Sequence, residues 1–164
     1  LTENYFKMGE SVVENSRDFL ERLVGQWLLT GKMGEVPLRQ EVSAGRTLGG
    51  KFLRLYFKSV TPADNPTAAY EAVYYLGFNE REQMYVMYLL DTTEVPTACV
   101  PGLGRREGNA IPFLFAYGDT EFSNTLTWHP DRDTWTFRQT YEEAGETRNF
   151  AEKEMIRVST QEEP

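Results

Sequence analysis

The stretch from Leu23 to Gly34, LVGQWLLTGKMG, marks a change of periodicity in the chain. Before it, residues 11–24 carry apolar side chains at helical spacing and begin with a capping-box pattern, which predicts one amphipathic helix. Gly25 is a natural helix stop, and from Trp27 onward apolar and polar residues alternate. Such alternation is typical of strands with one buried and one exposed face. We therefore expect a short helix at about 11–24 followed by strands.

Two later segments can be aligned as hairpins, and each alignment places apolar residues on one face. In the first, a four-residue loop at 79–82 pairs Leu76 with Tyr85. In the second, the turn that follows Trp128 pairs this residue with Trp135. Cross-strand pairs of aromatic and apolar residues stabilise a sheet by about 0.2–1 kcal/mol each. Both hairpins therefore support the assignment of strands.

The strands follow one another through short connections, without long helical crossovers, so we expect an antiparallel sheet. A sheet of this size must close or split to remove its edges. We predict an all-β fold, a closed antiparallel up-and-down β-barrel of about 9–10 strands. The barrel should span about 25–158 within a single domain, 1–164. The alternative is a two-sheet sandwich. Residues 92–110 are the least regular and predict an edge strand or a loop.

Charge and composition exclude several classes of partner. The formal net charge is −8, which argues against nucleic-acid binding because phosphate contacts need a basic surface. No apolar run approaches the roughly 18 residues of a membrane span. Cys99 is the only cysteine, so no disulfide can form within the chain. We favour a cytoplasmic location, but the chain begins at Leu1, and a removed targeting segment stays open.

The residues that usually carry metal or cofactor chemistry are scarce. Zinc sites take about four His, Cys or carboxylate ligands, and this chain has one histidine and one cysteine. Asp131 and Asp133 match only a fragment of a calcium loop, whose closing glutamate is missing. The glycine-rich segment 102–108 fits neither a phosphate loop nor a dinucleotide fingerprint. We predict no metal, no cofactor and no catalytic residue. The sequence leaves enzyme activity open and favours binding.

The order of the motifs resembles a known group of barrels. A short helix, then Gly25-Gln26-Trp27 entering the first strand, then an antiparallel meander is similar to the calycin group of lipocalin-like proteins. In that group the tryptophan covers the closed end of the barrel, and a basic residue from the last strand packs near it. Arg157, in EMIRV, is the matching residue. The resemblance therefore implies packing of Arg157 at the barrel end.

More closely, the chain resembles a bacterial lipocalin-like family whose biochemical role is unassigned. The similar segments occur in the family's order over about residues 19–158: LVGQW, TLGGKFLRLYF, YLGFNEREQMYVMYLLD, WHPDRDTWTFRQTYEE and EMIRV. This resemblance implies the fold and supplies no activity. The related nitrobindin-like barrels bind haem through a histidine inside the barrel. Here the only histidine, His129, falls in a predicted turn, so we expect no haem ligation.

These patterns favour a protein that binds a small, mainly apolar molecule inside the barrel. The candidate ligand-binding residues lie on the predicted inward face and are Trp27, Met33, Leu55, Phe57, Tyr74, Tyr85 and Met87. Aromatic and methionine side chains suit adaptable apolar recognition, but they also fill cores. A packed barrel without a cavity is therefore the competing interpretation of the same residues.

Two alternative functions stay open. The barrel could be a scaffold that self-associates, for example as a homodimer, through outward aromatic residues such as Tyr75 and Tyr88. It could also be an enzyme with a polar cluster inside the barrel. The residues considered for that cluster are Arg54, Tyr56, Glu71 and Arg138. The predicted register points both arginines outward, which counts against this cluster. Two or more interior ionisable groups with shifted pKa values would favour an enzyme.

Overall fold

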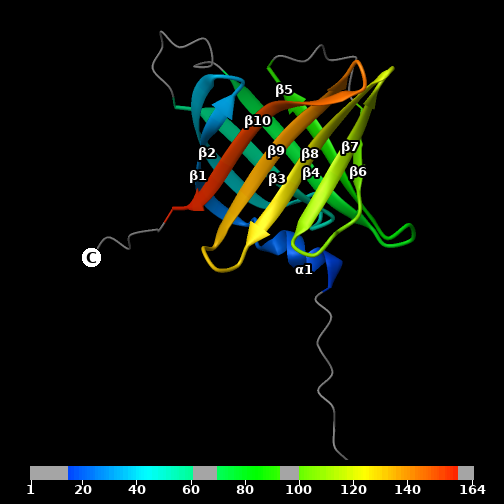
Figure 1. The fold of residues 1–164 in the computed structure, drawn as a ribbon. Helices are drawn as coiled ribbons and strands as arrows, with labels where there is room; N and C mark the ends of the chain where they lie inside the picture. The colour runs from blue at the N-terminus through cyan, green and yellow to red at the C-terminus, as the bar shows by residue number, and fades with distance from the viewer. Residues whose placement is uncertain (1–14, 61–69, 93–99, 159–164) are drawn as a thin grey trace, which may run out of the picture.

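The computed structural model describes residues 15–60, 70–92 and 100–158. In these residues one short helix precedes ten strands (Figure 1). The elements are α1 (Ser16–Glu21), β1 (Gly25–Met33), β2 (Val36–Thr47), β3 (Phe52–Ser59), β4 (Glu71–Asn79), β5 (Met84–Asp91), β6 (Gly102–Gly104), β7 (Ala110–Tyr117), β8 (Thr120–His129), β9 (Thr134–Glu143) and β10 (Glu146–Arg157).

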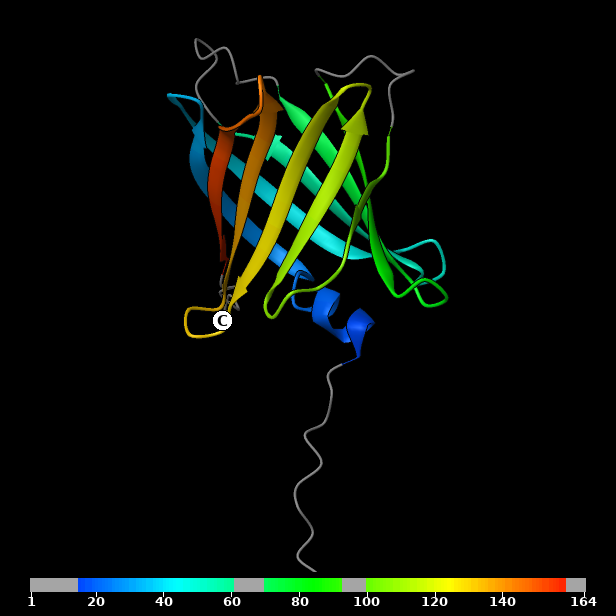
Figure 2. The same cartoon turned by 45° about the vertical axis from the view of Figure 1, so that its right-hand side comes forward.

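The strands form a closed barrel in which every strand pairs antiparallel with its neighbours in sequence. β1 closes the barrel against β10, with Trp27 opposite Arg157 and Met33 opposite Ala151. The predicted closed up-and-down barrel is confirmed, and the two-sheet sandwich is wrong. Helix α1 lies across one end, which we call the closed end (Figure 2). The hairpins β1–β2, β7–β8 and β9–β10 turn at the opposite end, which we call the mouth.

Helix α1 is shorter than its prediction. It begins at Ser16, where the Asn15 side chain accepts a hydrogen bond from the Arg17 amide at 3.1 Å and caps the helix. The predicted capping box, in residues 11–14, lies outside the described residues. The helix ends at Glu21 rather than at 24, because the next amides bond back three residues in tight turns. Gly25 then enters β1 with φ +134°, a conformation that favours glycine.

The second hairpin pairs as predicted, and the first does not. Trp128 faces Trp135 in the β8–β9 hairpin. In the β4–β5 hairpin Leu76 pairs with Met87 rather than with Tyr85. The Asn79 side chain accepts hydrogen bonds from two following amides, at 3.1 and 3.2 Å, which places the turn one residue later than predicted. The resulting shift of two residues leaves the same side chains inside, because the faces of a strand alternate with period two.

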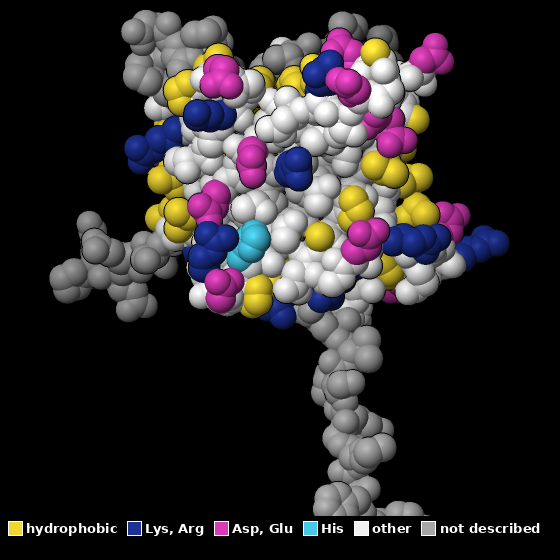
Figure 3. Space-filling model, viewed as in Figure 1, with side chains coloured by type: hydrophobic (Ala, Val, Ile, Leu, Met, Phe, Trp, Pro, Cys, Tyr) yellow, Lys and Arg dark blue, Asp and Glu magenta, His cyan; other side chains and the backbone are white. Residues whose placement is uncertain are grey.

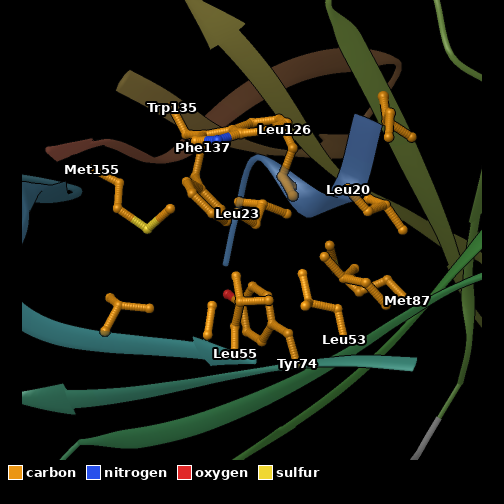
Figure 4. Packing of buried hydrophobic residues seen from close by; sticks show 14 of the residues in the cluster. Leu20, Leu23, Leu53, Leu55, Tyr74, Met87, Leu126, Trp135, Phe137 and Met155 are labelled. Carbon is orange, nitrogen blue, oxygen red and sulfur yellow. The ribbon is translucent and has the colours of Figure 1, made fainter. Parts of the chain in front are cut away.

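The closed half of the barrel is a packed apolar core. Leu20 of α1 and Leu23, which follows the helix, point into the barrel between side chains of the opposite walls (Figure 4). Phe19 packs edge-on against Trp135, with ring centroids 5.3 Å apart. The largest side chains here are almost completely buried: Phe19, Leu23, Trp27, Leu29, Leu55, Tyr85 and Trp135. Burial of such side chains stabilises a fold by about 1.5–3 kcal/mol each.

The outer surface is mixed in charge. On the face seen in Figure 3, acidic and basic side chains of the described residues are interspersed rather than gathered by sign. None of the helices in the part of the chain that the structure describes is long and apolar enough to cross a membrane.

Gly31 permits the contact that closes the barrel. It pairs with Lys153 of β10 on one side and with Leu38 of β2 on the other. A Cβ atom added to Gly31 would overlap the carbonyl oxygen of Glu152 and lie 2.7 Å from the Cα of Lys153. Both neighbours are backbone atoms, which cannot move aside without distorting the strand pair. Glycine at position 31 is therefore required by the close approach of β1 and β10.

We expect Gly31→Ala to destabilise the barrel by about 1–3 kcal/mol, because the new methyl group overlaps backbone atoms at the seam. Urea unfolding followed by tryptophan fluorescence measures the change. Gly45→Ala, in the next strand, is the matched control, since a Cβ there meets nothing within 4 Å. The control should be neutral or more stable by about 0.5–1 kcal/mol. Equal effects of the two substitutions would contradict this role for Gly31.

Candidate functional site

Trp27 and Arg157 meet at the closed end of the barrel. The Arg157 guanidinium lies over the Trp27 ring, 4.0 Å from its centroid, and donates to the Val24 carbonyl at 2.9 Å. The Trp27 indole donates to the Leu23 carbonyl at 2.7 Å. A Cβ at Gly25 would lie 2.8 Å from an Arg157 nitrogen. The Gly-x-Trp sequence thus leaves room for an arginine that joins β10 to the chain leaving α1.

Four of the predicted ligand-binding residues lie in the packed core. Leu55 and Met87 have no exposed surface, and Trp27 is 1% exposed. Tyr85 is 2% exposed, and its hydroxyl donates to the Ser16 carbonyl at 2.7 Å, which fixes the start of α1. The polar atoms of Trp27 and Tyr85 are both committed to the α1 segment. These contacts explain the residues as parts of the closed end without a ligand.

The other predicted residues lie nearer the mouth. Phe57 and Tyr74 are both 2% exposed, and their ring centroids are 4.5 Å apart. Met33 is partly buried at the last position of β1, opposite Ala151. Phe57 and Tyr74 border a layer of polar side chains that the strand alternation directs into the barrel. The candidate site is built around this layer.

We call this set the polar layer. Each member is buried in the barrel and comes from a different strand: Gln40 of β2, Ser59 of β3, Tyr74 of β4, Asn124 of β8, Gln139 of β9 and Lys153 of β10. Two pairs face each other directly across neighbouring strands, Gln40 with Ser59 and Asn124 with Gln139. The layer lies above the apolar core, on the side of the mouth.

Several atoms of the polar layer are buried without a hydrogen-bond partner. The side-chain oxygens of Gln40, Asn124 and Gln139 and the hydroxyl of Ser59 are in this state. The amide nitrogens are better satisfied, since Gln139 donates to the Tyr74 hydroxyl at 3.4 Å and Asn124 to the Met87 sulfur at 3.8 Å. A buried polar atom without a partner costs about 1–3 kcal/mol. Because buried polar atoms in native proteins usually have a partner, these acceptors mark a candidate binding site.

Lys153 is the most unusual member of the layer. It is 4% exposed and forms no hydrogen bond or ion pair with any residue that the structure describes. Burial lowers the pKa of its amine to about 8, and the negative charge of Asp91 opposes this shift. Gly31, opposite Lys153 on β1, places no side chain beside the amine. Buried lysines without an ion pair are rare, and a perturbed pKa is a mark of functional sites.

The charge of Asp91 acts on both Lys153 and Tyr74. Burial raises the pKa of the Tyr74 hydroxyl, and the charge of Asp91 raises it further. Tyr74 therefore stays neutral at physiological pH and acts only through hydrogen bonds. Asp91 is partly buried at the mouth end of β5 and accepts a hydrogen bond from the Tyr70 hydroxyl at 3.0 Å.

Aromatic side chains line one side of the mouth above the polar layer. We call them the rim aromatics, and they are Phe115, Tyr117, Phe122, Tyr141 and Phe150. Neighbouring rings lie 5.7–6.4 Å apart between centroids. Phe150 is 38% exposed and lies where the β9–β10 register shifts. Gly102 makes room for this group, because a Cβ there would overlap the Phe115 ring.

Sequence reasoning missed Lys153, although a signal was present. Ala151, Lys153 and Met155 alternate along the last strand, and both apolar neighbours are fully buried. The register shift near Phe150 interrupts the alternation of apolar and polar residues along the strand. The residues before the shift therefore do not predict on which face Lys153 lies. A lysine between two inward apolar residues near the chain end is the feature that could have indicated it.

The polar residues considered earlier for an interior enzyme site lie elsewhere. Arg54, Glu71 and Arg138 are exposed, and Tyr56 stacks beneath the Arg54 guanidinium, so this cluster is wrong. His129, the only histidine, ends β8 and lies 3.0 Å from the Thr136 hydroxyl, outside the barrel. Cys99 lies outside the described residues. Among the described residues, no group of three His, Cys, Asp or Glu side chains could hold a metal.

Two other surface features lie away from the polar layer. A shallow groove outside the barrel, between α1 and the β3–β4 strands, includes none of the predicted ligand-binding residues among its lining. On the outer face of β5, β6 and β7, four large apolar side chains are 37–47% exposed: Tyr88, Leu90, Leu103 and Leu114. Nothing in the described residues shows what covers this face, so self-association stays a prediction.

Comparison with known proteins gives no assignment, because no protein-family model and no curated protein matches this chain. The closed ten-stranded antiparallel barrel is consistent with a lipocalin-like fold. Such a barrel is compatible with ligand binding, since one of this size can enclose a small molecule.

We expect Lys153→Met to stabilise the protein at pH 7 by about 3 kcal/mol. Folding lowers the pKa of this lysine from its ordinary 10.5 to about 8. Burial of the ammonium form therefore costs about 3 kcal/mol of folding free energy. The penalty is complete below pH 8 and disappears as pH rises to about 10.5, where the amine is neutral in both states. The stability difference between the variant and the wild type should therefore shrink over this range.

Urea unfolding at pH 6, 7, 8, 9 and 10 measures this difference, with Lys58→Met as the control. Lys58 is exposed on the outer face of β3, so its substitution should give a small difference that does not vary with pH. The carboxylate of Asp91, whose charge acts on Lys153, is present in both proteins. A Lys153→Met difference that is constant from pH 6 to 10 would show that the amine is solvated.

Proposed function

We propose that the barrel binds a small amphipathic molecule through its mouth. An oxygen-bearing polar group of the ligand meets Lys153 and the amides of the polar layer, and the apolar part lies among the rim aromatics. The observation that carries this proposal is the buried residue Lys153, which is 4% exposed as a whole and has no hydrogen bond or ion pair among the described residues. Natural proteins retain such a costly group when a ligand uses it.

The packing supports this orientation of the ligand. In the apolar core, side chains such as Leu55 and Trp135 have no exposed surface, and close packing leaves little room for a ligand. By contrast, Phe150 and the partly buried Tyr117 still present apolar surface at the mouth. The ligand therefore enters with its polar end first. Of the residues predicted from the sequence, Met33, Phe57 and Tyr74 contribute to this site.

The same arrangement favours membership of the lipocalin-like group as a binding protein. Trp27 and Arg157 then stabilise the closed end of the barrel. The sequence predicted a mainly apolar ligand, and we propose an amphipathic one instead. From the motifs and their order, we propose that this chain belongs to the bacterial lipocalin-like family.

Decanoate is a suitable first probe, because its carboxylate can pair with the Lys153 ammonium and its chain suits the aromatic rim. We expect saturable binding at pH 7, measured by isothermal titration calorimetry. Lys153→Met should weaken binding at least tenfold, which corresponds to about 1.4 kcal/mol. Affinity should also fall as pH rises past the Lys153 pKa of about 8.

The matched control is Lys58→Met, which removes an exposed lysine from the outer face of β3. Its affinity for decanoate should equal that of the wild type. If the wild type shows no saturable binding, or if the two substitutions have the same effect, the proposed site is wrong.

A further inference from the structure

We propose that Lys153 takes an aldehyde as its ligand and holds it as a reversible imine. This inference rests on the proposed function, since it names the chemical class of the ligand for the same site. Three observations carry it: the buried Lys153 side chain, which has no hydrogen bond or ion pair among the described residues, the interior amide oxygens that have no partner among them, and the cluster of rim aromatics.

The first observation concerns the state of the amine. Lys153 lies inside the barrel at 4% exposure, and no carboxylate of the described residues forms an ion pair with it. Imine formation requires the neutral amine, whose lone pair is the nucleophile. An amine with a pKa of about 8 is about one-tenth neutral at pH 7, roughly 300-fold more than an ordinary lysine. The burial of Lys153 thus produces the reactive form without a separate base.

The second observation concerns the surrounding acceptors. The side-chain oxygens of Gln40, Asn124 and Gln139 are buried and accept no hydrogen bond. A carboxylate ligand has no hydrogen to give them. The addition product of an amine and an aldehyde carries both an O–H and an N–H donor. The polar layer is therefore more complementary to the products of carbonyl addition than to a bound acid.

The reaction balances with the groups present. The Nζ lone pair of Lys153 attacks the carbonyl carbon and forms the C–N bond, while the carbonyl electron pair moves to oxygen. That oxygen takes up a proton, and the nitrogen loses one, which gives the carbinolamine. Cleavage of the C–O bond then releases the oxygen as water after a second proton transfer from nitrogen. One amine and one aldehyde give one imine and one water, with no oxidation or reduction.

The third observation decides what kind of aldehyde fits. The rim aromatics lie nearer the mouth than Asn124 and Gln139, and Phe122 contacts Phe115, Tyr117 and Phe150. An apolar chain that extends from the imine carbon toward the mouth would lie against these rings. Aliphatic or aromatic aldehydes are thus favoured over sugars, whose hydroxyl groups would be desolvated there.

Decanal with sodium cyanoborohydride tests the inference in the full chain. The reagent supplies the hydride that reduces an imine to a stable secondary amine, and peptide mass mapping then locates the added decyl group. Lys32, Lys51 and Lys58 are exposed and serve as internal controls within the same molecule. At pH 7 we expect labelling of Lys153 at least tenfold faster than that of each control lysine.

The pH profile separates a reactive amine from mere proximity. The preference for Lys153 should be largest near pH 7 and should shrink toward pH 10, where ordinary lysines also become neutral. Asp91 of β5 is the charged group whose field acts on the amine, and the same charge acts on Tyr74 of β4. Because Asp91 favours the ammonium, Asp91→Asn should increase the labelling of Lys153 at pH 7.

The outcomes of the two probes distinguish the inference from the proposed function. If decanoate binds in a Lys153-dependent manner but decanal labels Lys153 no faster than Lys58, the site exists and the imine inference is overturned. If neither probe depends on Lys153, both proposals are wrong. Fast, selective labelling of Lys153 supports both proposals. The mapping uses the wild-type protein, so its result does not depend on the folding of a variant.

Discussion

The pairing of β1 with β10 decides which side chains this barrel encloses. The seam aligns Gly31 with Lys153, and only a residue without a side chain fits between the two backbones. Once the seam has formed, the alternation of β10 fixes Ala151, Lys153 and Met155 inside, whatever their polarity. A charged residue is thus carried into the interior by the same constraint that removes the sheet edges. The position of the candidate site follows from closure rather than from any local preference of lysine.

The two halves of the barrel contribute to stability in opposite directions. The closed half buries α1 and the large aromatic residues. The Trp27 indole there donates to a backbone carbonyl, whereas the Trp135 indole nitrogen has no partner among the described residues. The mouth half holds a desolvated amine and unpaired amide oxygens, each of which costs free energy. A fold can retain that cost only because the closed half is so well packed. A binding site on a rigid scaffold is expected to combine a stable, well-packed end with an end whose buried polar groups lower the stability of the fold.

The sequence predicted the fold well, because two simple physical signals agree. The Trp128–Trp135 register follows from the period of two and the turn chemistry, and it is correct. The β4–β5 register failed by two residues because the Asn79 side chain moves the turn, an effect that the apolar pattern cannot reveal. The site was less predictable. Lysine is read as an outward residue in a strand, and only the closed geometry shows that Lys153 points inward.

The order of layers along the barrel axis determines where ligand selectivity can arise. The apolar core is rigid, because residues such as Leu55 and Phe137, the cross-strand partners of Tyr74 and Lys153, are 0–1% exposed and fill the interior beside them. A longer ligand therefore cannot extend downward, and additional atoms must lie toward the mouth. Phe150, at the register shift of β10, is the most exposed of the rim aromatics and meets that part of the ligand. Chemical selectivity thus belongs to Lys153 and the amides, whereas selectivity for length and shape belongs to the rim. Differences in loop or rim residues could then change the preferred chain without altering the chemistry at the amine.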